Sequence, residues 1–165
     1  DAGRLVVVGA GLLALACAQC PEVEKVVGLD IDPENVRCSR ANAERNHLSH
    51  KASFFVADSY DVLDKEARKA FESEFAAADD DDDGTVKFDF IVANPPASDL
   101  ASSDGFDFRR EVLRGAASRL KPGGFVVMQA LSYYGQHRMA NAAPPHYRYC
   151  GVVTATPWVD LWTDA

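Results

Sequence analysis

The stretch from Arg4 to Ala16 reads RLVVVGAGLLALA and decides the fold class. Its first half, Leu5 to Val8, is an aliphatic run typical of a strand that is buried on both faces. Gly9-Ala10-Gly11 follows, and glycines at this density favour a tight turn with an accessible backbone. Residues 12–19 then have the composition of a helix, which Pro21 ends. The stretch therefore predicts a strand, a glycine turn and a helix in succession.

The rest of the chain continues this alternation. Further strands are expected at 25–29, 52–57, 88–93 and 125–129, and two more at 149–154 and 158–162. Helices are expected at 33–46, 60–78, 106–120 and 133–140, with a stop and turn at 121–124. Short strands separated by helices predict an α/β fold of three layers. Its sheet is expected to have seven strands, mostly parallel, with an antiparallel strand at the C-terminal end.

Length and composition indicate one globular domain. A chain of 165 residues holds one substantial core, and no apolar run approaches the roughly 20 residues of a membrane span. The acidic run Asp79 to Asp83 is expected to be a solvated loop insertion, at about 79–86, rather than a metal site. Because the chain begins with Asp1 and not with Met, we expect an N-terminal substrate-recognition segment to be missing from it.

Charge and cysteine content restrict the partners. The net charge of −8 argues against nucleic-acid binding by this chain alone, since phosphate contacts require clustered Lys and Arg. The basic residues of one region are expected on an exposed helix face: Arg109, Arg110, Arg114, Arg119 and Lys121. The only CxxC spacing is Cys17 to Cys20, so no metal site is expected. Four cysteines without a disulfide framework suit a reducing, cytoplasmic setting.

Glycines and polar residues follow each of the first four predicted parallel strands. They are Gly9-Ala10-Gly11, Asp30, Asp58 and Asn94-Pro95-Pro96, in chain order. In an open parallel sheet, ligands bind beyond the carboxyl ends of the strands. We therefore expect these residues to line one rim of the sheet.

The two aspartates have the chemistry of nucleoside binding. Asp30 lies 19 positions after Gly11, where a carboxylate can accept both hydroxyls of a ribose. The alternative role, capping the next helix, suits Asp32 better. Asp58, with Ser59 beside it, could accept an adenine amino group or cap a helix. This pattern fits a nicotinamide dinucleotide and S-adenosylmethionine equally.

Asn94-Pro95-Pro96 carries the most information. Two prolines fix the backbone and remove two amide donors, so the carbonyls around them are expected to be free to accept hydrogen bonds. The Asn94 side chain adds another carbonyl. Such a cluster can hold an NH2 group by both hydrogens and direct its lone pair towards an electrophile. The alternative is a rigid turn that simply ends a strand.

The chain resembles the class I S-adenosylmethionine-dependent methyltransferases, in the branch that carries an Asn-Pro-Pro-aromatic motif. The likeness runs from Leu5 to about Trp162 and rests on the glycine turn and four further stretches: VVGLDIDPENV (26–36), FFVADSYD (54–61), FDFIVANPPA (88–97) and LKPGGFVVMQ (120–129). In addition, DGFDFRR (104–110) resembles the segment before the fourth helix in the protein-glutamine methyltransferases that modify release factors.

The resemblance implies a Rossmann-like fold, S-adenosyl-L-methionine as cofactor, and N-methylation of an amino or amide nitrogen. The cofactor-binding residues that it implies are Val8, Gly9, Ala10, Gly11, Asp30, Ile31, Asp58, Ser59 and Asn94. It assigns Asn94 and the Pro95 carbonyl to the acceptor nitrogen, and Pro96, Ala97, Phe106 and Tyr133 to the substrate side. No metal is implied, and the acceptor is a protein, a nucleic acid or a small molecule.

Two positions depart from the family pattern. Leu12-Leu13 stands where a third glycine is usual, and Ala97 replaces the aromatic residue that normally stacks on a planar substrate. Tyr133, Tyr134 and Phe106 are candidates to replace that aromatic ring. Two alternatives therefore stay open: a methyltransferase-like scaffold without catalysis, and a dinucleotide-dependent oxidoreductase domain, which the register Gly-x-Gly-x-x-Ala would fit. A partner subunit is a further possibility.

Overall fold

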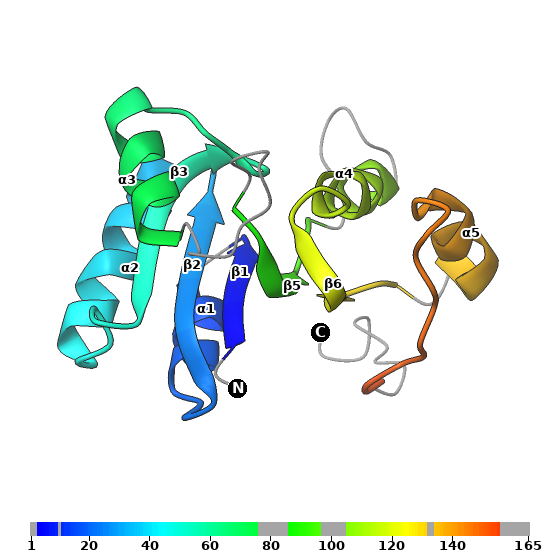
Figure 1. Ribbon diagram of the computed structural model, residues 1–165, viewed down its shortest axis with the longest axis horizontal. Helices are drawn as coiled ribbons and strands as arrows, with labels where there is room; N and C mark the ends of the chain where they lie inside the picture. The colour runs from blue at the N-terminus through cyan, green and yellow to red at the C-terminus, as the bar shows by residue number, and fades with distance from the viewer. Residues whose placement is uncertain (1–2, 10, 76–85, 97–104, 132–133, 156–165) are drawn as a thin grey trace, which may run out of the picture.

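The computed structural model describes residues 3–9, 11–75, 86–96, 105–131 and 134–155. Along the chain the elements are β1 (Gly3–Val8), α1 (Gly11–Ala18), β2 (Val23–Asp30), α2 (Pro33–Arg45), β3 (Ala52–Asp58), β4 (Asp61–Val62), α3 (Lys65–Phe75), β5 (Phe88–Ala93), α4 (Phe106–Ala116), β6 (Leu120–Met128) and α5 (Gly135–Ala142). The strands form one sheet in the order β4-β3-β2-β1-β5-β6, shown in Figure 1. All neighbours are parallel except β3 and β4.

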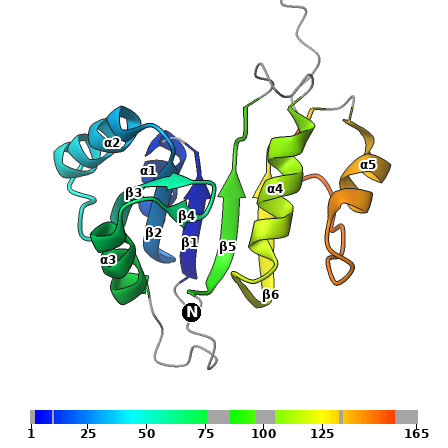
Figure 2. The same ribbon diagram turned by 90° about the horizontal axis from the view of Figure 1, so that it is seen from above.

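Helices cover both faces of this sheet, which confirms the predicted three-layer α/β fold (Figures 1 and 2). Successive residues of a strand point to opposite faces, so the aliphatic run of β1 supplies two cores. Leu5 and Val7 pack with α1 and α2, whereas Val6 packs with α3 and α4. The double burial of β1 is the reason why its sequence is continuously apolar.

The sheet differs from the prediction at its ends. The described residues form six strands, not seven, and the antiparallel strand is the short β4 after β3 rather than a C-terminal one. No strand forms at 149–154, where Val152 and Val153 are 70% and 86% exposed. Residues 158–162 lie outside the described residues. A β-branched run forms a strand only when a neighbouring strand pairs with it, and sequence preference alone does not supply that partner.

Two helix boundaries also differ from the prediction. The helix expected from residue 60 begins at Lys65, because Ser59 at φ +53° reverses the chain and Asp61-Val62 then pair with β3. The Asp64 carboxylate accepts a hydrogen bond from the Ala67 amide at 2.7 Å and so caps α3.

The prediction of a stop and turn at 121–124 is also wrong, because these residues lie within β6. Gly123 adopts φ +82°, and the pairing of β6 with β5 shifts register between Phe88 and Phe90. The glycines therefore form an irregularity inside a strand and do not end it.

Asp89 of β5 ties three strands together. Its carboxylate accepts from the Arg4 amide at 2.8 Å and pairs with Lys121 at 3.1 Å. Partial burial alone would raise the pKa of Asp89, but the hydrogen bonds from Arg4 and Lys121 outweigh it and hold the pKa below its usual range. The charged carboxylate is therefore favoured in the folded state.

We expect Asp89→Asn to lower the free energy of unfolding at pH 7 by about 1 kcal/mol. A depressed pKa contributes stability above the pKa of the unfolded state, about 4, and this stability is lost as the pH falls through the folded-state value. Urea denaturation at pH 7 and at pH 3 measures the effect. The gap between variant and parent should shrink at pH 3, and a gap that stayed constant would contradict this role of Asp89.

Candidate functional site

The glycine turn and Asn94 lie side by side at the carboxyl end of the sheet. Strand β1 pairs with β2 on one side and with β5 on the other, and Val8 is in register with both Leu29 and Ala93. The chain leaves β1 towards β2 and later returns on the opposite side as β5. The rim between β1 and β5 is therefore the topological switch point, where ligands bind in open α/β sheets.

Gly9 occupies the centre of this rim. Its amide donates to the Leu29 carbonyl at 2.8 Å, and its φ of +99° is a conformation that L side chains rarely adopt. A Cβ atom placed on Gly9 would lie 3.7 Å from the Asn94 carbonyl oxygen. The turn and the Asn94 backbone are thus direct neighbours. Ala10, predicted to belong to the same turn, lies outside the described residues.

Gly11 serves helix packing, which the sequence did not indicate. A Cβ atom at this position would lie 1.9 Å from the Ser39 hydroxyl oxygen and 2.5 Å from the Ser39 Cβ. The glycine therefore lets α1 lie close to α2. Close approach of a ligand, the reason expected from the motif, is not needed to explain it.

Gly11→Ala should accordingly destabilise the protein by about 1–3 kcal/mol, the usual range for overpacking a tight contact. The double variant Gly11→Ala/Ser39→Gly should recover most of this loss, because it removes both Ser39 atoms that clash. Thermal unfolding of the two single variants and the double variant measures the coupling. Additive losses in the double variant would show that Gly11 is required for another reason.

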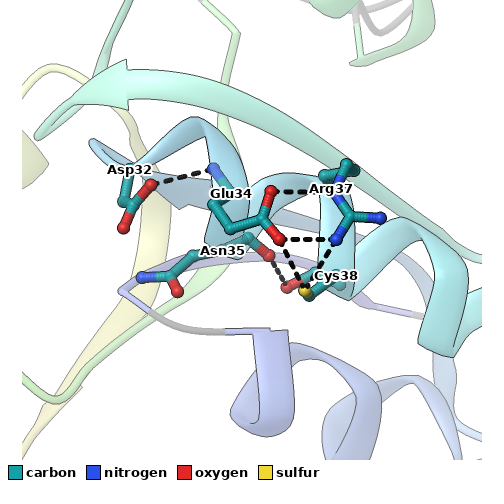
Figure 3. Close-up of polar contacts among 6 residues, drawn as sticks. Asp32, Glu34, Asn35, Arg37 and Cys38 are labelled. Carbon is teal, nitrogen blue, oxygen red and sulfur yellow. Dashed lines mark hydrogen bonds and ion pairs between the residues drawn. The ribbon is translucent and has the colours of Figure 1, made fainter.

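Asp30 is held in place at the end of β2. Its Oδ1 accepts from the Asp32 amide at 3.0 Å and from the Asn35 side-chain nitrogen at 3.4 Å. Its Oδ2 makes no hydrogen bond within the described residues. The helix cap is Asp32, whose carboxylate accepts from the Glu34 amide at 2.8 Å (Figure 3), as predicted. Asp30 thus keeps one carboxylate oxygen for a ligand, and Ile31 beside it is exposed.

The end of β3 forms the third side of the rim. Asp58 is exposed, and the Ser59 hydroxyl is buried without a hydrogen-bond partner in the described part of the chain. The Tyr60 hydroxyl donates to the Val112 carbonyl of α4 at 3.0 Å, and burial raises the pKa of Tyr60. A cavity of about 340 Å³ lies between this turn and Arg110 of α4. The exposed Asp58 carboxylate is therefore the group of this turn that a ligand can reach.

The carbonyls after Asn94 are not free, in contrast to the expectation. The Pro95 carbonyl accepts from an Nη of Arg109 at 3.0 Å, and the Pro96 carbonyl accepts from the other Nη. Arg109 was expected on an exposed face but is only 1% exposed. Asn94 itself is exposed at the end of β5. The side chain of Asn94 is therefore the accessible polar group of this motif.

Phe106 is not available for substrate stacking as the chain folds here. Phe106 and Tyr134 are 5% and 4% exposed, and their rings meet edge to face at 5.3 Å between centroids. The Arg138 guanidinium lies 3.8 Å from the Phe106 centroid. These contacts attach α5 to α4. Of the other predicted substrate residues, Pro96 is exposed, and Ala97 and Tyr133 lie outside the described residues.

Sequence reasoning missed Arg109 as a buried group, although a signal was present. Phe106, Val112, Leu113 and Ala116 are the other buried residues of α4, and Arg109 falls on the same helical face at the spacing of three or four residues. An arginine on an apolar stripe indicates a guanidinium with internal partners. Within the described residues no group of His, Cys, Asp or Glu side chains could hold a metal ion, and no described helix is long and apolar enough to cross a membrane.

Comparison with known families identifies the fold. The family Ribosomal protein L11 methyltransferase (PrmA) matches residues 6–160. The chain belongs to this family. This membership agrees with the predicted methyltransferase fold and with S-adenosyl-L-methionine as the expected cofactor, and it gives no support to a dinucleotide-dependent oxidoreductase.

The individual relatives include further proteins named as methyltransferases. The chain is 33% identical over 116 residues to a ribosomal protein L11 methyltransferase of Photobacterium profundum, covering 70% of this chain and 29% of that protein. It is 28% identical over 153 residues to a putative protein N5-glutamine methyltransferase of Methanocaldococcus jannaschii, covering 84% and 66%. The crystal structure of TrmN from Thermus thermophilus superposes with a TM-score of 0.58 at 26% identity, covering 88% and 37%. This PrmA-family chain therefore spans only part of the length of each relative.

The cofactor suits the residues at the rim. Gly9 forms a tight turn at positive φ, Asp30 has a carboxylate oxygen without a hydrogen bond in the described residues, and Asp58 is an exposed carboxylate. These three groups come from the ends of β1, β2 and β3, which are consecutive neighbours in the sheet. Leu12 and Leu13, which stand where a third glycine is usual, lie in the first turn of α1, and Leu12 is exposed.

Proposed function

We propose that the protein transfers a methyl group from S-adenosylmethionine to an amide nitrogen of a protein side chain. The observation that carries this proposal is the position of Asn94 beside the Gly9 turn, at the switch point between β1 and β5. A nitrogen held by Asn94 lies next to the turn assigned to the cofactor. The relative named as a protein N5-glutamine methyltransferase supports the choice of acceptor.

Each residue has a role that follows from its position. Asp30 would accept hydrogen bonds from the ribose hydroxyls, and Asp58 with Ser59 would bind the adenine. When bound, the cofactor supplies an electrophilic methyl group. The Asn94 side-chain oxygen would accept an N–H of the acceptor amide and orient its nitrogen. Catalysis then rests on positioning, with the reacting atoms held about 3 Å apart, and no strong base is needed at the barrier.

The charge of Arg109 supports a neutral acceptor. The guanidinium of an arginine is cationic, and the four hydrogen bonds that Arg109 donates within the described residues all go to uncharged oxygens. This positive charge lies directly behind the Pro95 and Pro96 carbonyls. A protonated amine brought to Asn94 would be repelled by it, whereas a neutral nitrogen would not. The rim therefore suits an acceptor that is neutral when it binds, such as an amide, better than an alkylammonium group.

Methyl transfer from labelled S-adenosylmethionine to whole-protein acceptors tests the proposal. A peptide release factor and ribosomal protein L11 serve as probes, and mass spectrometry locates the methyl group. We expect label on a glutamine side-chain nitrogen of the release factor. Label confined to amines of ribosomal protein L11 would contradict the amide assignment.

The free thiols also lead us to propose a cytoplasmic location, since such cysteines persist in reducing compartments.

A further inference from the structure

Arg109 makes an unusually complete set of contacts. One Nη donates to the Pro96 and Gly105 carbonyls, the latter at 2.9 Å. The other Nη donates to the Pro95 carbonyl at 3.0 Å and to the Gln129 side-chain oxygen at 2.7 Å. All four Nη hydrogens are therefore used. The guanidinium joins the end of β5 to the start of α4 and to the residue after β6.

This arrangement is costly for a residue that only fills space. Arg109 is 1% exposed, and within the described residues no carboxylate forms an ion pair with it. Its Nε–H is buried without a partner in the same part of the chain. Burying a charge without a counter-charge is unfavourable, and an apolar side chain of similar length would avoid the cost. The contacts that Arg109 makes must therefore serve another need.

That need lies in the two prolines. Pro95 and Pro96 have no N–H, so their carbonyls are the only backbone groups by which the fold can hold this segment. Arg109 binds both carbonyls. Tyr134 lies against the other side of the guanidinium, 5.2 Å from its central carbon to the ring centroid. The guanidinium is thus itself fixed from α5, from α4 and from the end of β6.

We propose that Arg109 is a positioning residue for methyl transfer. By fixing the Pro95 and Pro96 carbonyls it sets the direction of the Asn94 side chain, which precedes them at the rim. Arg109 does not contact the acceptor in this role. The proposal rests on the proposed function for its kinetic consequence, but its structural consequence concerns Asn94 alone.

Variants at Arg109 should separate turnover from binding. For Arg109→Met we expect kcat with the acceptor to fall roughly 10- to 30-fold, because a small misplacement of a reacting group is enough for such a loss. The Kd for S-adenosylhomocysteine, measured by calorimetry, should stay within about threefold, since Arg109 is not assigned to the cofactor. Arg109→Lys should recover part of kcat, because an ammonium can still donate to one or both carbonyls.

Arg40→Met is the matched control. Arg40 also donates through two nitrogens to a backbone carbonyl, that of Phe54 in β3, with its Nε at 3.0 Å. It lies on α2, away from the rim. Its loss should lower the melting temperature and leave kcat unchanged. Equal losses of kcat in the Arg40 and Arg109 variants would reduce Arg109 to a structural role and overturn the proposal.

An NMR measurement that needs no methyl acceptor tests the positioning role of Arg109 separately from the proposed methyl transfer. In protein labelled with ¹⁵N at asparagine, the Asn94 side-chain NH2 signal is assigned by its absence from Asn94→Ala. We expect one sharp signal in the parent and in Arg40→Met, and broadened or doubled signals in Arg109→Lys and Arg109→Met. If Arg109→Met does not fold, the Asn94 signal of Arg109→Lys tests the proposal instead. An unchanged Asn94 signal would overturn the role of Arg109 even if the parent transfers methyl groups. A changed signal would support that role even if no acceptor is methylated.

Discussion

Asn94→Ala should lower methyl transfer at least about 100-fold while S-adenosylhomocysteine binds with nearly the parent affinity. The Asn94 side chain is the exposed polar group of the motif, because Arg109 occupies the carbonyls of Pro95 and Pro96. Without it the acceptor nitrogen has no fixed partner at the rim, and loss of orientation alone can reduce a rate by this factor. Rate measurements at saturating cofactor, together with calorimetry, determine the two effects separately.

Asn141→Ala provides the control for this result. Asn141 lies in α5, where its side chain contacts His137 at 3.0 Å, and it has no role at the rim. Its replacement should leave both kcat and cofactor affinity unchanged. If Asn94→Ala retained the parent rate, the motif would be only a rigid turn after β5, and the scaffold alternative would regain support.

Asp30→Ala should weaken S-adenosylmethionine binding at least about 100-fold. A carboxylate that accepts two ribose hydroxyls makes two charge-assisted hydrogen bonds, each worth about 1.5–3 kcal/mol, and about 1.4 kcal/mol corresponds to a factor of ten in Kd. Asp30→Asn should lie between the parent and the alanine variant, because an amide keeps one acceptor oxygen. Calorimetric titration of the three proteins measures the series.

Asp32→Ala separates this effect from damage to α2. Asp30 also accepts hydrogen bonds from the start of that helix, so its loss disturbs the helix end. Asp32 caps the same helix (Figure 3), and its replacement should lower stability by about 1 kcal/mol with little change in Kd. Equal losses of affinity in the Asp30 and Asp32 variants would remove Asp30 from the ribose site.

Local sequence patterns were sufficient to predict most of the sheet. The aliphatic runs of β1 and β2 are buried on both faces, and β3 and β5 are apolar and mostly buried, which gives these strands a clear signal. The Asp32 cap followed from Asp32-Pro33 at a helix start. The predicted strand at 149–154 did not form, because the chain there finds no strand to pair with. The shift of α3 to Lys65 depended on the reversal at Ser59, a backbone conformation that its sequence does not announce.

The candidate site was predictable in its members but not in its contacts. The rule that ligands bind at the carboxyl ends of strands brought Gly9, Asp30 and Asn94 together. The reason for Gly11 required the position of Ser39, 28 residues further along the chain. The partner of the Pro95 carbonyl required the burial of Arg109 on α4. Such contacts depend on how distant elements pack, and one strand end or helix face cannot reveal them.

The most direct test of the central claim is a calorimetric titration of the protein with S-adenosylhomocysteine and, separately, with NAD. The claim is that Gly9, Asp30 and the end of β3 form a site for S-adenosylmethionine beside Asn94. The account predicts micromolar binding of S-adenosylhomocysteine, its weakening in Asp30→Ala, and no heat from NAD. Binding of NAD alone, or S-adenosylhomocysteine binding that is unaffected by Asp30→Ala, would contradict it.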